Sequence, residues 1–161
     1  MEHTVRRAGT ADAHLLGQLL FDFNTEFEAP TPTASALAER FRSLLAGTDL
    51  VAFLAECAEG VEHPAVRTSG FALLSLRPTP YSEGPLAQLE ELYVRPPLRD
   101  QGIGTALLGA TSAHARSRGS LEMHIGVDEI DSDTRRFYER HGFVNVQPGQ
   151  DYRMLLYLRE L

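Results

Sequence analysis

A short apolar run, a glycine turn and a helix-like run occupy residues 88–108, and this order constrains the chain most. Residues 89–94 are apolar-rich and end at Pro96–Pro97, and the turn Arg99-Asp100-Gln101-Gly102-Ile103-Gly104 follows. The first N–H groups of a helix have no partner inside it, and the helix dipole adds partial positive charge there. Glycine lets the main chain approach a ligand that a Cβ would push away. The turn therefore predicts a phosphate-binding site.

Two common phosphate-binding motifs are excluded by the residues that follow this turn. A dinucleotide-binding fingerprint needs a third glycine at the position that Leu107 occupies, and a P-loop needs Lys and Ser/Thr directly after its last glycine. Gly104 is instead followed by Thr105 and Ala106. The remaining pattern is Arg-x-x-Gly-x-Gly behind a strand that ends in Leu-Tyr-Val.

This pattern resembles the coenzyme A signature of the GNAT superfamily of N-acetyltransferases. A second block, 136–143 (RFYERHGF), is similar to the Phe-Tyr-x-x-x-Gly-Phe element of the same family, and the run 89–94 (LEELYV) is similar to a strand of diamine and polyamine N-acetyltransferases. The resemblance is strong from Gln88 to Phe143 and extends elsewhere by layout only. It implies an enzyme that moves an acetyl group from acetyl-CoA to a primary amine, here expected on a small cationic molecule.

Several alternatives to that function stay open at this point. Within the same chemistry, the acceptor could be a protein N-terminus or a lysine. A non-catalytic acyl-CoA-binding sensor or partner module would keep the phosphate turn without the chemistry. A nucleotide-binding domain with different chemistry is the third alternative.

The resemblance also implies which residues hold the coenzyme. The main chain of 99–105 would bind the pyrophosphate, with a further contact from the Arg99 side chain, and the strand main chain at Leu92 and Val94 would pair with the pantetheine arm. Asp100 departs from the family, in which glycine is frequent at this position, and Asp131 stands where relatives often carry asparagine. The expected coenzyme-binding set is Leu92, Tyr93, Val94, Arg99, Asp100, Gln101, Gly102, Ile103, Gly104, Thr105 and Asp131.

The chemistry requires a proton acceptor, because an alkyl ammonium with a pKa of about 10 cannot attack a thioester while it is charged. Strand alternation predicts one face with Gln88, Glu90, Leu92 and Val94, and another with Leu89, Glu91 and Tyr93. The resemblance places the acid/base residue on the first face, so Glu90 is the expected base, acting directly or through a water. An exposed carboxylate without a role is the alternative for Glu90. Glu91 is expected to be structural or solvated.

The resemblance assigns protonation of the coenzyme thiolate to Tyr138, for which a helix tyrosine packed into the core is the alternative. Asp22, Glu26 and Glu28 could form an anionic rim for a cationic acceptor, although a solvated helix face explains them as well. His124 either approaches the acceptor or is structural. Cys57 is not expected to be a nucleophile, and the histidines and this cysteine lack the spacing of metal ligands.

The hydrophobic periodicity predicts a succession of strands and helices. This order matches the fold that the resemblance implies, which is α/β (α+β) with a mixed, mostly antiparallel sheet of six to seven strands and about four flanking helices. A hairpin connection is expected over residues 59–64 and an irregular loop over 77–85. The expected helices begin after Thr10, at Ser35, after the glycine turn and at Asp131 or Ser132. The expected strands are 4–7, 51–55, 67–76, 89–94, 121–127, 143–146 and 152–158.

Length and charge bound the remaining properties. A chain of 161 residues is expected to form a single domain over 1–161. A net charge of −7 argues against nucleic acid or an anionic membrane as a partner and suits a small cationic amine. A single cysteine, no signal-peptide core and no apolar run of about 20 residues predict a cytoplasmic protein without a membrane span. Dimerisation is common in the family, so the resemblance allows for a homodimer.

Overall fold

The computed structural model describes residues 3–57 and 67–161. The chain forms two compact units, Met1–His124 and Ile125–Leu161. The expected hairpin connection over residues 59–64 lies outside the described residues. A single domain over 1–161 stays a prediction.

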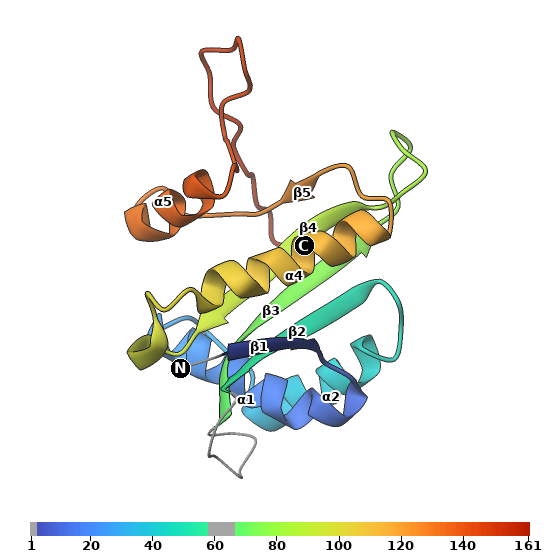
Figure 1. Ribbon diagram of the computed structural model, residues 1–161, viewed down its shortest axis with the longest axis vertical. Coiled ribbons are helices and arrows are strands. Elements are labelled where there is room, and N and C mark those ends of the chain that lie inside the picture. Colours follow the sequence, from blue (N-terminus) through green and yellow to red (C-terminus); the bar gives the residue numbers. More distant parts are fainter. Residues whose placement is uncertain (1–2, 58–66) are drawn as a thin grey trace. The chain divides into compact units, whose positions relative to one another are not determined.

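Five strands within the described residues form one sheet in the order β1-β2-β3-β4-β5 (Figure 1). Neighbours are antiparallel from β1 to β4, whereas β4 and β5 run parallel, so the expected mixed, mostly antiparallel sheet is confirmed. The strands are β1 (His3–Arg7), β2 (Leu50–Cys57), β3 (Thr68–Arg77), β4 (Leu86–Val94) and β5 (Met123–His124).

Four α-helices in the described part of the chain match the expected number. They are α1 (Ala13–Glu26), α2 (Ala34–Leu44), α4 (Ile103–Ser117) and α5 (Ser132–Arg140). Thr10 lies in a short 3-10 turn, η1 (Thr10–Asp12), rather than at the cap of α1, while a second such turn, η2 (Pro96–Leu98), follows β4. Thr33 caps α2, because its hydroxyl accepts a hydrogen bond from Ala36 N at 3.2 Å.

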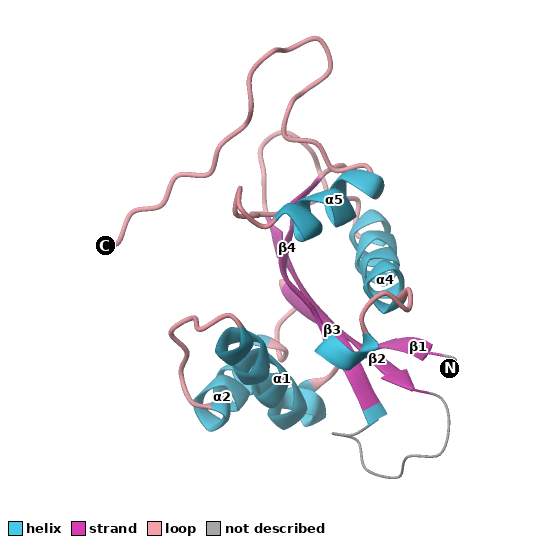
Figure 2. Ribbon diagram, turned by 90° about the vertical axis from the view of Figure 1, so that its left-hand side faces the viewer, coloured by secondary structure: helices cyan, strands magenta, loops and turns pink. Residues whose placement is uncertain are grey.

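Helices cover both faces of the sheet within the first unit, with α1 and α2 on one side and α4 on the other (Figure 2). The two sheet faces have separate apolar clusters. On the α1 and α2 side, strand residues Leu54, Phe71, Leu73 and Tyr93 pack against Leu16, Leu19 and Phe41. On the α4 side, Leu74, Leu76 and Ala87 pack against Ala115.

The prediction of six to seven strands is wrong in the C-terminal part of the chain. The expected strand 121–127 shortens to the two residues of β5, and the expected strands 143–146 and 152–158 are irregular. A strand needs a neighbouring chain for its N–H and C=O groups. A hydrogen bond from Met154 N to Asn145 O, at 2.6 Å, joins the two segments without extending into a ladder. Large side chains there are exposed: Val144, Tyr152, Leu155, Leu156, Tyr157 and Leu158.

No helix among the described residues has both the length and the apolar character that a membrane crossing requires. The cytoplasmic location stays a prediction.

Candidate functional site

The turn between β4 and α4 has an unusual backbone. Asp100 has φ 61° and Gly102 has φ 80°, so two residues of this short turn adopt the left-handed conformation. Gly102 directly precedes α4, and a Cβ built on it would meet no heavy atom within 4 Å. The left-handed backbone explains why glycine suits both positions, and the open space at Gly102 is the kind of surface that a bulky ligand can approach.

The start of α4 exposes main-chain donors at this turn. In the part of the chain that the structure describes, the amides of residues 101–104 donate to no protein acceptor. Ile103 and Leu107 are buried and fix the first turn of the helix against the sheet. These N–H groups lie at the positive end of a helix of 15 residues, an arrangement that favours anions. The expected binding of a coenzyme diphosphate there stays a prediction.

Among the described residues of the first unit, one edge of β4 has no strand partner beside the turn. The ladder to β5 consists of Ala87↔Met123 and Gln88↔His124, so β4 continues past its parallel partner. Arg95 N donates to Ser69 O on β3 at 2.9 Å. Since main-chain groups alternate between the two neighbours of a strand, the groups of Leu92 and Val94 face the opposite edge. An extended ligand arm could pair there.

A β-bulge at Glu90 changes the faces of β4 from those that simple alternation predicts. Leu74 pairs with Leu89 and Leu73 pairs with Glu91, which leaves Glu90 without a cross-strand partner. Partners in a ladder share a face, and Leu73 belongs to the α1 and α2 cluster whereas Leu74 belongs to the α4 cluster. The alternation prediction is therefore wrong from residue 91 onward. Glu91 and Tyr93 lie on the α1 and α2 side with Gln88, and Leu92 and Val94 lie on the α4 side with Leu89.

Glu90 and Glu91 share the same face of the sheet. Glu90 is exposed, and its Oε1 accepts a hydrogen bond from Ser75 Oγ, whose residue pairs with Gln88 on the α1 and α2 side. Glu91 is half-buried. Burial first, and then the negative charge of Glu90, raise the pKa of Glu91 to about 7. Alternation along the strand contains no signal for this raised pKa, and the expectation that Glu91 is structural or solvated stays a prediction.

Two arginines tie the turn to helix α1. Arg99 Nη2 lies 2.7 Å from Glu26 Oε1, and Arg99 Nε donates to Val94 O at 3.0 Å. Arg95 Nη1 lies 3.5 Å from Asp22 Oδ2. Asp22 and Glu26 are thus paired with cations rather than forming an open anionic rim, and Arg99 would have to leave Glu26 to reach a phosphate. Glu28 is exposed just beyond α1.

The second unit holds the remaining expected residues. Tyr138 on α5 is 5% exposed, with its ring centroid 5.1 Å from that of Phe137 and 5.4 Å from that of Phe143. Asp131 caps α5, because its Oδ1 accepts from Thr134 N at 3.1 Å. The coenzyme contact of Asp131 and the acid role of Tyr138 stay predictions.

The other polar candidates have ordinary surroundings. His124 is exposed, with its Nε2 3.2 Å from Glu122 Oε2. Cys57 is buried at the end of β2. Within residues 3–57 and 67–161, no group of three or more His, Cys, Asp or Glu side chains could hold a metal ion.

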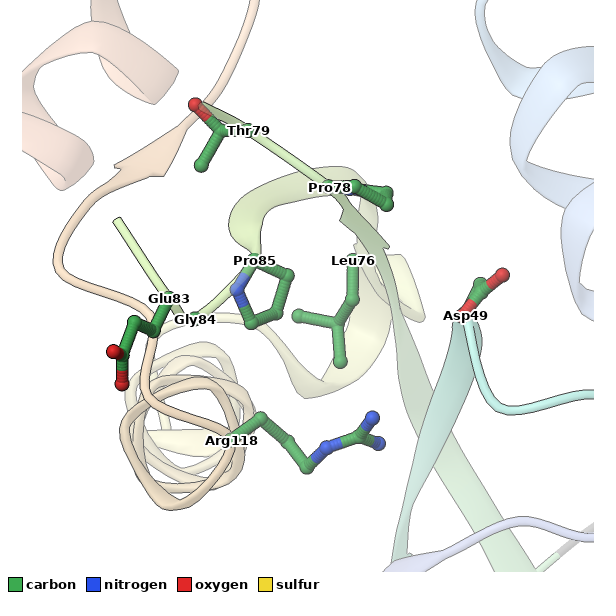
Figure 3. Close-up of a pocket in the computed structure, with 8 residues that line it drawn as sticks. All are labelled: Asp49, Leu76, Pro78, Thr79, Glu83, Gly84, Pro85 and Arg118. Atoms are coloured by element: carbon green, nitrogen blue, oxygen red, sulfur yellow. The ribbon is translucent and has the colours of Figure 1, made fainter. Parts of the chain in front are cut away.

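A cavity of about 220 Å³ lies at the other end of β3 and β4 (Figure 3). Its lining includes part of the expected 77–85 loop, and the side chains of Leu76 and Pro85 face each other in it. Arg118, just past the C-terminal end of α4, also lines it. A helix of 15 residues is about 22 Å long, so this cavity is separate from the glycine turn.

Comparison with known proteins gives concordant matches. The model of the acetyltransferase (GNAT) family matches residues 19–143. An aminoglycoside N(6')-acetyltransferase type 1 of Klebsiella aerogenes is 38% identical over 88 residues, which is 52% of this chain and 57% of that protein. A mycothiol acetyltransferase of Thermobispora bispora is 39% identical over 72 residues, 45% of this chain and 24% of that protein. The chain thus spans about half of the first relative and about a quarter of the second.

A solved structure matches over the whole chain. It is the crystal structure of a protein from Arthrobacter sp. FB24 that is described as a candidate acetyltransferase. The identity is 48%, the TM-score is 0.88, and the match covers 100% of this chain and 97% of that one. The arrangement of sheet and helices is therefore shared along the full length of this chain.

Proposed function

We propose that this chain, which belongs to the GNAT acetyltransferase family, is an acetyl-CoA-dependent N-acetyltransferase acting on a primary amine of a small cationic molecule. Acetyl-CoA is the acetyl donor of this family and supplies an activated thioester carbonyl. The observation that carries the proposal is the left-handed turn before α4, whose amides have no protein acceptor in the described residues and follow a strand, β4, that is only partly paired with β5.

Each part of the site has a separate task in this proposal. The amides of residues 101–104 bind the diphosphate, and the main chain of Leu92 and Val94 pairs with the pantetheine arm and orients the acetyl carbonyl. The resemblance assigns proton acceptance to Glu90, directly or through a water, and proton donation to the leaving sulfur to Tyr138. The reaction proceeds by direct attack of the amine in a ternary complex.

The charge of the chain supports a cationic acceptor. The net charge is −7, and the Glu90–Glu91 pair is an anionic feature on the sheet face next to α1. The first relative is named for the N(6') position of aminoglycosides, a class of small amines. Its match covers only part of both chains, so aminoglycosides are one group to test rather than an assigned substrate.

Thiol release from acetyl-CoA over a panel of amines tests the proposal. The panel contains aminoglycosides, polyamines, amino acids and peptides with a free N-terminus or lysine. We expect release to rise above the amine-free rate with at least one small cationic amine, and the product to gain one acetyl group by mass spectrometry. Transfer only to peptides would move the function to protein acetylation. Tight binding of coenzyme A by calorimetry without transfer to any amine would identify a binding module instead.

A further inference from the structure

Two adjacent carboxylates lie on the same face of β4, which a regular strand does not allow. The bulge at Glu90 rotates the strand so that Glu91, paired with Leu73, joins Glu90 on the α1 and α2 side. A bulge next to a functional site commonly redirects a side chain. The local geometry therefore offers two candidate proton acceptors where alternation offers one.

The two carboxylates have different partners. Glu90 is exposed, and its Oε1 accepts the hydrogen bond of the Ser75 hydroxyl. Glu91 is half-buried, and in the described part of the chain its carboxyl has neither a hydrogen-bond donor nor a cation as partner. Ser75 thus holds the Glu90 carboxyl in place, while the Glu91 carboxyl stays available to a ligand.

The charged groups on the surrounding elements leave Glu91 without compensation. On α1, Asp22 and Glu26 are paired with Arg95 and Arg99, respectively. On the neighbouring strand β5, His124 is paired with Glu122. On β4 itself, Tyr93 lies two residues along on the same face and contacts Phe23 of α1, with ring centroids 5.1 Å apart.

We propose that Glu91, rather than Glu90, accepts the proton of the amine, and that Glu90, anchored by Ser75, is a positioning residue for it. This inference rests on the proposed N-acetyltransferase function. The raised pKa of Glu91, about 7, supports the geometric argument. A base with a pKa near the working pH takes a proton from the substrate and returns it to solvent efficiently. An ordinary glutamate, with a pKa of about 4.3, is a much weaker acceptor.

The protons and bonds balance in this scheme. The Glu91 carboxylate takes one proton from the ammonium group of the acceptor. The neutral nitrogen then forms the C–N bond as the C–S bond breaks, and a second proton moves from that nitrogen to the sulfur. Glu91 finally releases its proton to water, so each turnover yields one amide, one free thiol and one proton.

The experiment measures kcat/KM from pH 5.5 to 9 for the wild type, Glu91→Gln and Glu90→Gln, with an amine that the panel identifies. In the wild type we expect kcat/KM to fall as the pH drops below about 7. In Glu91→Gln we expect kcat/KM to be lower by about 100-fold or more and to lack this fall near pH 7. Glu90→Gln removes a neighbouring negative charge, so in this variant the fall moves to lower pH, and kcat/KM at pH 8 is reduced less than tenfold. The titration of the substrate amine also changes kcat/KM with pH. This part of the profile is recognised because it moves when an amine of different pKa is used.

Two controls separate a catalytic role from a structural one. Glu39→Gln makes the same substitution on an exposed face of α2 and should leave the profile unchanged. Glu91→Gln should bind coenzyme A with the affinity of the wild type and should melt at no lower a temperature, which excludes misfolding. Carbon-13 NMR of the glutamate carboxyls should show one group that titrates near pH 7 and is absent from Glu91→Gln.

The possible outcomes distinguish the two proposals. If the wild type acetylates an amine and Glu91→Gln retains both the rate and the fall near pH 7, the role of Glu91 is overturned while the enzyme function stands. If Glu90→Gln loses the activity and Glu91→Gln does not, the base is Glu90. If the wild type acetylates no amine, the proposed function fails and the role of Glu91 fails with it.

Discussion

Asp100 combines two properties that work against its position in the turn. Its backbone is left-handed, with φ 61°. Its carboxylate belongs to the residue directly before 101–104, whose amides would bind a diphosphate. Aspartate tolerates the left-handed region better than most residues but less well than glycine. The charge adds repulsion toward any bound phosphate.

We predict that Asp100→Gly binds coenzyme A more tightly than the wild type. One unit charge about 4 Å from another is worth on the order of 1 kcal/mol in water, which corresponds to roughly a fivefold change in Kd. Isothermal calorimetry at low and high salt checks this, because screening should reduce the gain. Asp100→Asn removes the charge and keeps a side chain that tolerates φ > 0. An unchanged Kd in both variants would show that the carboxylate points away from the ligand.

Gly102 is expected to be sensitive for a conformational rather than a steric reason. A Cβ there meets nothing within 4 Å, but φ is 80°. We predict that Gly102→Ala lowers the free energy of unfolding by about 1 kcal/mol. Gly102→Asn should recover part of this loss, because asparagine enters the left-handed region more easily. Urea unfolding measures both, and equal stability of the alanine variant and the wild type would contradict the assigned backbone.

At the scale of elements, helices α1 and α2 pack through a glycine. A Cβ on Gly17 would lie 2.6 Å from Ala34 O and 2.7 Å from Ala38 N, both of them backbone atoms of α2. Leu16 and Leu19 beside it are fully buried. The helices can approach this closely only where α1 has no side chain.

We predict that Gly17→Ala destabilises the protein by about 1–3 kcal/mol, because α2 must move away. Gly109→Ala is the matched control, since Gly109 lies in α4 and its Cβ would meet nothing within 4 Å. That variant should instead gain up to about 1 kcal/mol from helix propensity. Chemical unfolding of the two variants compares them directly. If both substitutions changed the free energy of unfolding in the same direction, packing between α1 and α2 would not decide the result.

At the scale of the whole molecule, an ion network anchors the first strand. Arg6 on β1 lies 2.8 Å from both Glu56 Oε1 and Asp12 Oδ1, and Arg67 lies 2.8 Å from Glu56 Oε2. Burial alone would raise the pKa of Glu56, but its hydrogen bonds from Arg6 and Arg67 lower it overall. The Arg6 hydrogen bonds also lower the pKa of Asp12.

We predict that Arg6→Ala costs about 1–3 kcal/mol at pH 7, because the buried Glu56 loses a charged donor. A carboxyl with a lowered folded-state pKa stabilises the fold above its unfolded pKa, and this contribution is lost as the pH falls through the folded value. The difference between variant and wild type should therefore shrink at acidic pH. Urea unfolding at pH 7 and about pH 3.5 tests this, and an equal difference at both values would refute the linkage.

Glu91 changes the stability of the fold with pH in the opposite direction to Glu56 and Asp12. Its pKa is raised in the folded state, to about 7, so the folded chain holds a proton that the unfolded chain releases between about pH 4.5 and 7. Stability contributed by this group falls across that range and is lowest above pH 7. We predict that Glu91→Gln has a higher melting temperature than the wild type at pH 8, by about 2–4 °C for each kcal/mol relieved. At pH 5 the variant and the wild type should melt at nearly the same temperature. Identical differences at both pH values would show an unperturbed carboxyl.

Patterns of neighbouring residues in the sequence were enough to predict most helices and strands of this protein and its family. Helical and strand periodicity located β1 to β4 and the four described helices, and the Arg-x-x-Gly-x-Gly order pointed to the family that the comparison then established. These features follow from residues close together in the chain: a cap such as Thr33, a stop such as Gly119, and glycine where φ is positive.

The tertiary structure decided what depends on partners distant in the chain. The register of β4 against β3 put the bulge at Glu90, moved Glu91 to the face of Tyr93, and set Ser75 beside Glu90. The same dependence left 143–146 and 152–158 irregular despite their strand-like composition. A strand face, an ion pair such as Glu26–Arg99 and the proton affinity of a carboxyl all depend on which segments meet, and alternation along one segment contains no information about that.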